Sequence, residues 1–258
     1  MALKSDRSLT PSWDGLAQMR VCFGHQSVGV DIMKALSALT GNHLEVIETN
    51  DAEVWQRPVF AHFRVGQNRD PFSKIQAFAQ VIDSGVGRRV DAAFFKLCYV
   101  DITANTDIDT LFLNYQRTMA LLRERYPKVV FLHVTVPLMC VGGGIMDWLR
   151  EKAGCVNRQQ EDQARRHAYN QMLRSAYGSS GRLFDLAEVE ATYPDGRPSC
   201  FPYHGDLVPT LVPEYTEDGG HLNQRAAEHV AARLLSCLVK TVNEPALLKT
   251  SRHAEGRP

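Results

Sequence analysis

The sequence has little of what marks a nucleic-acid-binding, secreted or membrane protein. Basic and acidic residues balance at 29 each, and no basic block stands out in the body of the 258-residue chain. This balance gives no indication of binding to nucleic acid or to an anionic membrane. The first residues form no apolar signal segment, and no apolar run is long enough to span a bilayer. We therefore expect a cytoplasmic protein, while a signal peptide already removed would leave the same pattern.

Cysteine is sparse as well, and its spacing argues against two common kinds of site. The six cysteines are scattered, with no C-x-x-C pair and no zinc-ribbon spacing. We expect most of the thiols to be reduced and partly buried. Cys140 and Cys155 flank a glycine-rich stretch and could be bridged in an oxidising compartment.

The apolar segments alternate between strand-like and helical periods. Apolar runs predict strands at 19–23, 44–48, 91–100, 128–136 and 182–186, with a long connection at 50–70. Amphipathic spacing predicts helices at about 30–40, 72–84, 108–126, 158–177 and 221–242. We therefore predict a three-layer α/β/α fold, flavodoxin-like, with a mainly parallel five-stranded sheet and helices on both faces. In this architecture ligands bind beyond the carboxyl ends of the strands.

The chain suits a single domain, because it has 44% hydrophobic residues and no internal repeat. We place that domain at 19–242, between an N-terminal lead-in at 1–18 and a C-terminal tail at 243–258. Loop insertions are expected near 137–157 and 190–217. The second insertion holds five of the twelve prolines, which argues against regular secondary structure there.

Ser27 stands where the first predicted strand gives way to a helix. Gly24 and Gly29 lie on either side of it and allow a tight turn. Its hydroxyl could cap the first turn of the helix, which is a common role for serine at this position. It could instead be a nucleophile at the positive end of the helix dipole, where its own N–H helps to stabilise an oxyanion.

A second candidate stretch precedes the last predicted helix. Asp218 stands three residues ahead of His221, within the string Glu-Asp-Gly-Gly-His-Leu-Asn. A carboxylate so placed can hold one ring nitrogen of the histidine and leave the other to act as a general base. An ordinary helix cap beside a surface histidine would have the same sequence. A metal site made of His25, Asp218 and His221 lacks support, because the three residues show no ligand spacing.

Together the two stretches resemble the SGNH (GDSL-like) hydrolase family over roughly residues 19–240. That family has a nucleophilic serine just after its first strand and an Asp-x-x-His motif at the start of its last helix. The resemblance implies Ser27 as the nucleophile, His221 as the general base and Asp218 as its orienting partner. It also implies that no cofactor is needed.

The oxyanion hole implied by the resemblance is incomplete. The family's oxyanion glycine corresponds to Gly66, and the N–H of Ser27 would be a further donor. The usual Gly-x-Asn-Asp lines up with Cys98-Tyr99-Val100-Asp101, so the family's asparagine is missing there. We hypothesise that Asn68 replaces it, because the loss of one such donor can cost about 100- to 1000-fold in rate.

Four residues are predicted to contact substrate. His25 and Gln26 stand in place of the family's acid, because the usual Gly-Asp-Ser is one residue longer here. Lys96 ends an apolar strand and could contact substrate or pair with Asp101. Tyr203 belongs to the proline-rich and aromatic stretch that we expect to wall the pocket.

These residues predict a serine esterase that acts through an acyl-enzyme on a small-molecule or glycan ester. A carbohydrate O-acetyl ester is the narrower prediction. A non-catalytic member of the fold that binds a glycan or an anion is an alternative, since a helix N-terminus with serine and glycines can bind anions without chemistry. An O-acyltransferase would use the same residues, whereas an α/β-hydrolase is disfavoured because its nucleophile lies deeper in the strand order. The sequence leaves the oligomeric state open.

Overall fold

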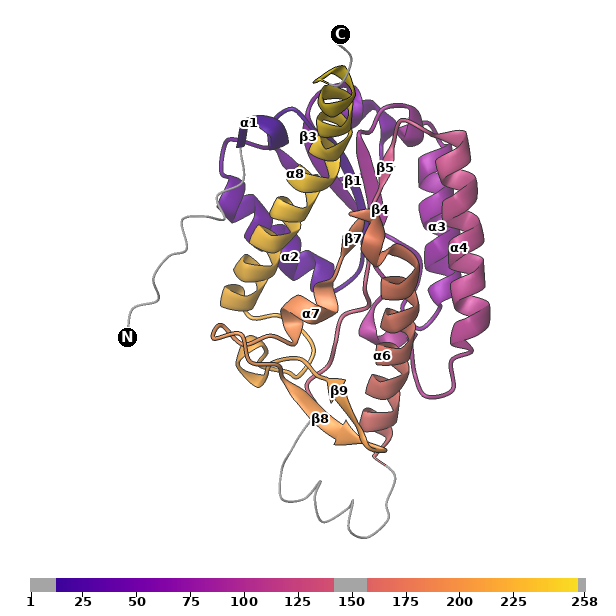
Figure 1. Cartoon of the computed structure of the whole chain (residues 1–258), viewed down its shortest axis with the longest axis vertical. Coiled ribbons are helices and arrows are strands. Elements are labelled where there is room, and N and C mark those ends of the chain that lie inside the picture. The colour runs from indigo at the N-terminus through magenta and orange to yellow at the C-terminus, as the bar shows by residue number, and fades with distance from the viewer. Residues whose placement is uncertain (1–12, 142–156, 255–258) are drawn as a thin grey trace.

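The computed structural model describes residues 13–141 and 157–254, and a parallel sheet lies at its centre (Figure 1). The strand order is β2-β3-β1-β4-β5, and all four pairings are parallel. The five strands are β1 (Arg20–His25), β2 (Val46–Glu48), β3 (Val59–Arg64), β4 (Ala92–Phe95) and β5 (Val130–Phe131). The predicted fold class, with a five-stranded parallel sheet between two helical layers, is confirmed.

One member of that sheet was not predicted. The connection expected at 50–70 contains β3, which pairs between β2 and β1. Its sequence contains His62 and Arg64, so it has no continuous apolar run, and hydrophobic periodicity therefore did not predict a strand there. The strand expected at 182–186 is β7 (Leu183–Phe184), and it pairs with β6 (His133–Val134) in a separate two-stranded parallel sheet.

Helices cover both faces of the sheet (Figure 1), as buried strands of a parallel sheet require. On one face α2 (Val28–Thr40) and α8 (Gln224–Ala254) enclose a core that includes Val21 and Phe23 of β1. On the other face lie α3 (Pro71–Asp83), α4 (Ile108–Arg125) and α6 (Arg158–Tyr177), around a second core that includes Cys22. The short helices are α1 (Trp13–Leu16) and α7 (Leu186–Glu190) and the 3-10 turns η2 (Ala52–Gln56), η3 (Val86–Arg88), η4 (Tyr99–Asp101), η5 (Gly178–Ser180) and η6 (Pro213–Tyr215).

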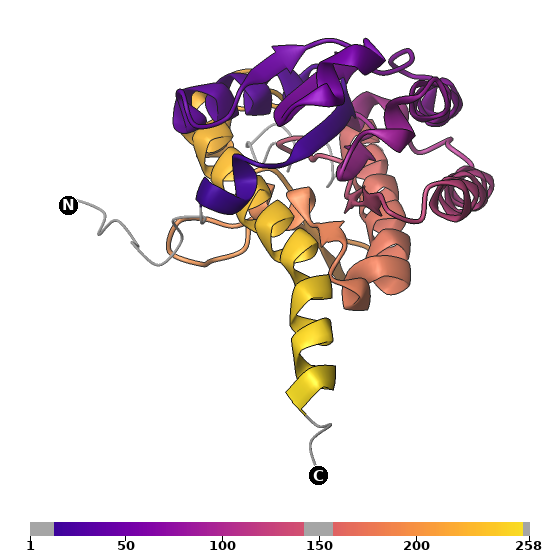
Figure 2. The same cartoon turned by 90° about the horizontal axis from the view of Figure 1, so that it is seen from above.

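The last helix differs from its prediction at both ends. It begins at Gln224 rather than at His221, because Asn223 caps it by accepting the N–H of Ala226 at 3.1 Å. The predicted end near 242 is wrong, since the helix continues to Ala254 and its C-terminal part projects beyond the body (Figure 2).

The proline-rich stretch at 190–217 is not wholly irregular, and that prediction is wrong in part. It holds an antiparallel hairpin of β8 (Cys200–Tyr203) and β9 (Asp206–Pro209). Each strand of a lone hairpin has a free edge, where a proline needs no ladder donor. The turn residues His204 and Gly205 have φ of 49° and 92°, as a two-residue hairpin turn requires.

Two expectations fall largely or wholly outside the described residues. Residues 142–156 of the insertion near 137–157 are not described, and Cys155 is among them. The possible bridge from Cys140 to Cys155 therefore stays untested. No helix in the described ranges is long and apolar enough to cross a membrane.

Candidate active site

Ser27 lies between the end of β1 and the start of α2, with a hydroxyl that caps nothing. Ser27 occupies the N-cap position of α2, but its side chain makes no capping hydrogen bond, so the predicted capping role of the hydroxyl is wrong. Its Oγ instead lies 3.9 Å from the Sγ of Cys98. Glycine is required at position 29, two residues after Ser27, because a Cβ there would lie 2.4 Å from the His25 side chain. A half-buried hydroxyl thus lies at the positive end of a 13-residue helix, in contact with the sulfur of Cys98 and not with the helix backbone.

Asp218 and His221 form the pair that the sequence predicted. The Nδ1 of His221 lies 2.6 Å from Oδ2 of Asp218. The other carboxylate oxygen accepts the backbone N–H groups of Gly220 and His221, at 2.9 and 2.8 Å. The hydrogen bond from the His221 ring and those from the backbone hold the pKa of Asp218 well below its usual range. The carboxylate therefore stays ionised, occupies Nδ1 and leaves Nε2 as the nitrogen that can take a proton.

The turn η4 lies against both halves of this candidate site. Its N-cap residue Cys98 contacts Ser27, and the ring of Tyr99 lies edge-on to the His221 ring with centroids 6.0 Å apart. Gly220 packs so closely that a Cβ there would lie 2.9 Å from the Tyr99 ring. Among the described residues no hydrogen bond joins Ser27 to His221. Catalytic hydrogen bonds are often long in free enzymes and tighten only when substrate binds.

The loop after β3 is tied to the serine through Gln26. The amide of Gln26 donates to the carbonyl oxygens of Val65 and Gly66, at 3.1 and 2.9 Å. Gly66 has φ of 52°, and a Cβ there would lie 2.6 Å from the backbone of Lys74. Only glycine fits this position. Gln26 was predicted to contact substrate, but its amide is used in bracing the loop.

Asn68 has one end of its amide fixed by a buried lysine. Its Oδ1 accepts a hydrogen bond from the Nζ of Lys74 at 2.9 Å. An ammonium group can only donate, so the oxygen must face it and the amide NH₂ must point elsewhere. Asn68 is exposed, and its NH₂ group is therefore available as a donor to a ligand.

A buried ion pair holds this loop and η4 together. Lys74 Nζ lies 2.6 Å from Oδ2 of Asp101, and both side chains are completely shielded from solvent. Asp101 also accepts the backbone N–H groups of Cys98 at 2.6 Å and Arg69 at 2.8 Å. Since Lys74 takes this carboxylate, the expected pairing of Lys96 with Asp101 is wrong.

Two predicted substrate contacts are buried instead. His25 has no exposed surface, and its Nε2 lies 2.9 Å from Nδ1 of His62 on β3. Burial, with a smaller effect of Lys96, lowers the pKa of His25 to about 3, so that the ring is neutral at physiological pH. Lys96 is 1% exposed and its Nζ lies 3.9 Å from the Sγ of Cys98. The prediction that His25 and Lys96 contact substrate directly is therefore wrong for this conformation.

Tyr203 lies on β8, half-buried, with its ring beside those of Phe201 and His204. Its contact with substrate stays a prediction. Within the described residues there is no group of three or more His, Cys, Asp and Glu side chains that could hold a metal ion.

The sequence placed Cys98 and Tyr99 in the segment that lines up with the family's Gly-x-Asn-Asp. It did not predict that Cys98 contacts Ser27 or that the Tyr99 ring lies against His221. Contacts of Cys98 and Tyr99 had no local signal, because they depend on the packing of distant segments.

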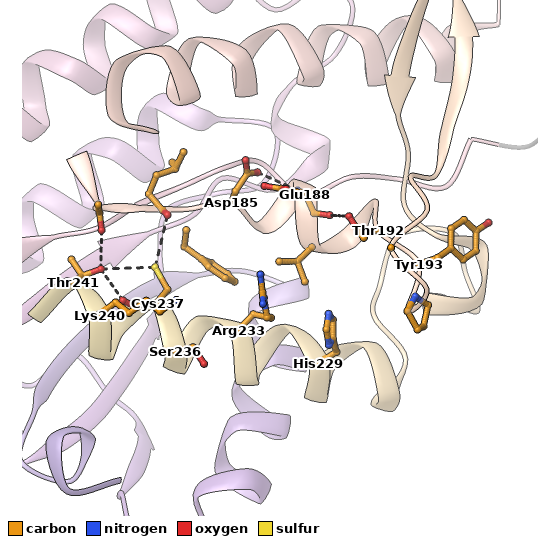
Figure 3. A pocket seen from close by; sticks show the side chains of 16 residues that line it. Asp185, Glu188, Thr192, Tyr193, His229, Arg233, Ser236, Cys237, Lys240 and Thr241 are labelled. Atoms are coloured by element: carbon orange, nitrogen blue, oxygen red, sulfur yellow. Dashed lines mark hydrogen bonds between the residues drawn. The ribbon is translucent and has the colours of Figure 1, made fainter. Parts of the chain in front are cut away.

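One cavity lies away from this site. It has a volume of about 570 Å³ and runs between α8 and the segment of β7 and α7 (Figure 3). Its lining includes Arg233, Lys240 and Phe184, but none of the three predicted catalytic residues. Nothing in its position connects it to Ser27.

Comparison with known proteins does not identify the activity of this chain. No family model and no curated protein matches the chain. A Streptococcus pneumonia protein, provisionally described as a platelet activating factor, is 14% identical with a TM-score of 0.49, over 90% of this chain and 91% of that one. A Desulfitobacterium hafniense DCB-2 protein, provisionally described as a lipolytic protein of the G-D-S-L family, is 9% identical with a TM-score of 0.45, over 84% and 97%. At such values the activity of this chain has to be inferred from its own residues.

Proposed function

We propose that this protein is a serine hydrolase of SGNH type, which cleaves an ester through an acyl-enzyme. The observation that carries the proposal is the Asp218–His221 hydrogen bond, together with a Ser27 hydroxyl that lies at a helix N-terminus and makes no capping hydrogen bond. A module that only binds an anion has no need of a carboxylate that orients a histidine. Ser27 and His221 come from separate segments and both lie beside η4, since Ser27 contacts Cys98 and the His221 ring lies against that of Tyr99.

In the proposed reaction the Oγ of Ser27 attacks the ester carbonyl while Nε2 of His221 takes its proton. The alcohol leaves with that proton, and a water activated by His221 then releases the acid. Asp218 holds the imidazole and stabilises its protonated form without taking the proton itself. The backbone N–H groups of Ser27 and Gly66 and the NH₂ of Asn68 are the proposed oxyanion donors.

The substrate class that we favour is an O-acetyl ester of a carbohydrate. The support is the aromatic content of the β8–β9 hairpin, where Phe201, Tyr203 and His204 lie together. Aromatic side chains combine an apolar face with a polar edge and can stack on a sugar ring. Comparing an acetylated sugar with its propionyl and butyryl analogues would test both the sugar and the acyl group.

The test of the function is labelling by a fluorophosphonate probe, which modifies only an activated serine. We expect stoichiometric modification of Ser27 in the wild-type protein, with parallel hydrolysis of p-nitrophenyl acetate. Ser27→Ala should abolish both signals. Ser84→Ala is a matched control, because this exposed serine only donates to the carbonyl of Val81. An inert wild-type protein would contradict the proposal and favour the binding module.

A second prediction concerns the replacement of the missing oxyanion asparagine. Asn68→Ala should lower kcat by about 100- to 1000-fold with little change in KM, because an oxyanion donor acts mainly in the transition state. Gln67→Ala, which removes the neighbouring exposed amide, serves as the control. Acyl-transfer rates of Asn68→Ala within about twofold of wild type would show that another group is the donor.

A further inference from the structure

The cavity between α8 and the segment of β7 and α7 has walls that are tied to each other. Thr241 on α8 donates through its Oγ1 to the carbonyl oxygen of Gly181, at 3.0 Å. One turn earlier, the Sγ of Cys237 lies 3.8 Å from the carbonyl oxygen of Leu183 on β7. The space of about 570 Å³ between these walls is therefore formed by the fold itself. Sites for small molecules usually have volumes of about 300 to 1000 Å³.

One face of α8 lines this cavity with polar side chains. His229, Arg233, Cys237 and Lys240 follow one another at steps of three or four residues, so they share one side of the helix. Figure 3 shows His229 and Arg233 on the side of α8 that faces α7. The face of α8 that packs in the core is apolar instead, and its buried residues include Val230, Leu234, Leu235 and Leu238.

Two cations of the lining have no acidic partner. Among the described residues, no ion pair or hydrogen bond is formed by the side chain of Arg233 or of Lys240. Of the two carboxylates in the lining, Asp185 is already held by Arg174 at 2.6 and 2.9 Å. Only Glu188 is an unpaired acid within the described part of the chain. Unpaired positive charge therefore exceeds unpaired negative charge, and the cavity favours an anion.

The cavity also has an apolar wall. Phe184 is 5% exposed, and it lines the space together with Leu183 and Val189, which are both half-buried. An apolar lining with a few polar groups is characteristic of sites for small organic molecules. An inorganic anion would leave this wall without a contact. The lining thus suits a ligand that has an apolar body as well as a negative charge.

We propose that this cavity is a binding site for an amphiphilic organic anion, a carboxylate with an apolar chain or ring. The guanidinium of Arg233 binds the carboxylate, because its planar fork matches the two carboxylate oxygens. The apolar body lies against Phe184 and Val189. Lys240 adds a second positive charge about 10 Å farther along the helix axis, at a rise of 1.5 Å per residue. The site is separate from Ser27, and the inference does not depend on the proposed hydrolysis.

Titration calorimetry with octanoate tests the role of the cations. We expect saturable binding to wild type, weakened about tenfold in Arg233→Gln and about threefold in Lys240→Gln, because a direct charge-assisted contact outweighs a more distant charge. Both residues are exposed, so neither substitution should disturb the fold. Arg225→Gln is the matched control, since it removes the same charge from an exposed position of α8 outside the lining. An octanoate affinity that is unchanged in Arg233→Gln overturns the inference.

Two further ligands separate the charge from the apolar body. Octanol has a similar chain without the charge, and inorganic phosphate has the charge without a chain. Both should bind at least about tenfold more weakly than octanoate. Octanol that binds as tightly as octanoate would contradict the role of Arg233, and phosphate that does so would contradict the role of the apolar wall.

Backbone amide NMR of the wild-type protein locates the ligand without any substitution. Octanoate should shift the amides of 183–193 and 229–241 and leave those around Ser27 in place. Shifts confined to the surroundings of Ser27 and His221, or no saturable binding at all, overturn the inference. None of these results depends on the reactivity of Ser27. A protein that is inert to the fluorophosphonate probe but binds octanoate beside α8 would therefore keep this inference while losing the proposed function.

Discussion

Replacing His221 with alanine is expected to lower kcat by at least about 1000-fold, because His221 is the proposed base that takes the Ser27 proton. His221 contributes little to packing, since it lies in a loop with 43% of its side chain exposed. The variant should therefore keep its melting temperature while losing p-nitrophenyl acetate hydrolysis. His229→Ala is a suitable control, because this exposed histidine lies on α8 beside the distant cavity.

Variants of Asp218 and of Ser27, the two residues proposed to act with His221, should lower kcat to different extents. Asp218→Asn keeps a side chain of the same size but removes the negative charge beside Nδ1 of His221. We expect kcat to fall by about 100- to 10,000-fold. In the double variant Ser27→Ala/His221→Ala, kcat should be no lower than in either single variant, because residues that act as a unit are not additive. A His221→Ala protein within tenfold of wild type would contradict the assigned base.

Breaking the buried pair of Lys74 and Asp101 is expected to have the largest effect on stability. Lys74→Met leaves the Asp101 carboxylate shielded from solvent without its cation, which typically costs about 3 to 5 kcal/mol. For a chain of this size the melting temperature should fall by roughly 10 °C. Thermal unfolding followed by circular dichroism measures this change.

The double variant Lys74→Met/Asp101→Leu tests the reason for that loss. Replacing both partners by apolar groups removes the uncompensated charge and should restore part of the stability. Activity should stay low, because Asn68 loses its anchor and the N–H groups of Cys98 and Arg69 lose their acceptor. Arg197→Met is the control, since its ion pair with Asp195 is exposed and its loss should hardly change the melting temperature. A Lys74→Met variant as stable as wild type would show that the ion pair of Lys74 and Asp101 does not stabilise the fold.

The helices were predictable because their signals are local. Asp70 caps α3 and Pro71 begins it, Asp107 caps α4, and Asn157 caps α6, so each start agrees with the prediction to within a residue. The central strand β4 was found for a similar reason, since its run of Ala and Phe is apolar on both faces. Strand β3 was not, because a half-polar sequence resembles a loop until its neighbours are known.

The same distinction holds at the candidate site. Asp218 and His221 are three residues apart, and the pairing that the sequence suggests is the one that forms. The pairing of Lys74 with Asp101 spans 27 positions, and that of His25 with His62 spans 37. No spacing rule predicts such contacts, because each depends on which strands become neighbours in the sheet.

The sequence by itself determined the class of fold, the place of Ser27 after the first strand and the Asp218–His221 pair. These follow from periodicity, capping and short-range hydrogen bonds, which act over a few residues. Only the tertiary structure decided that His25 and Lys96 are buried, and that Lys74 anchors Asn68. The physical reason is that burial and charge pairing depend on the order in which β3, β1 and β4 lie side by side, and that order is set by the packing of the whole chain.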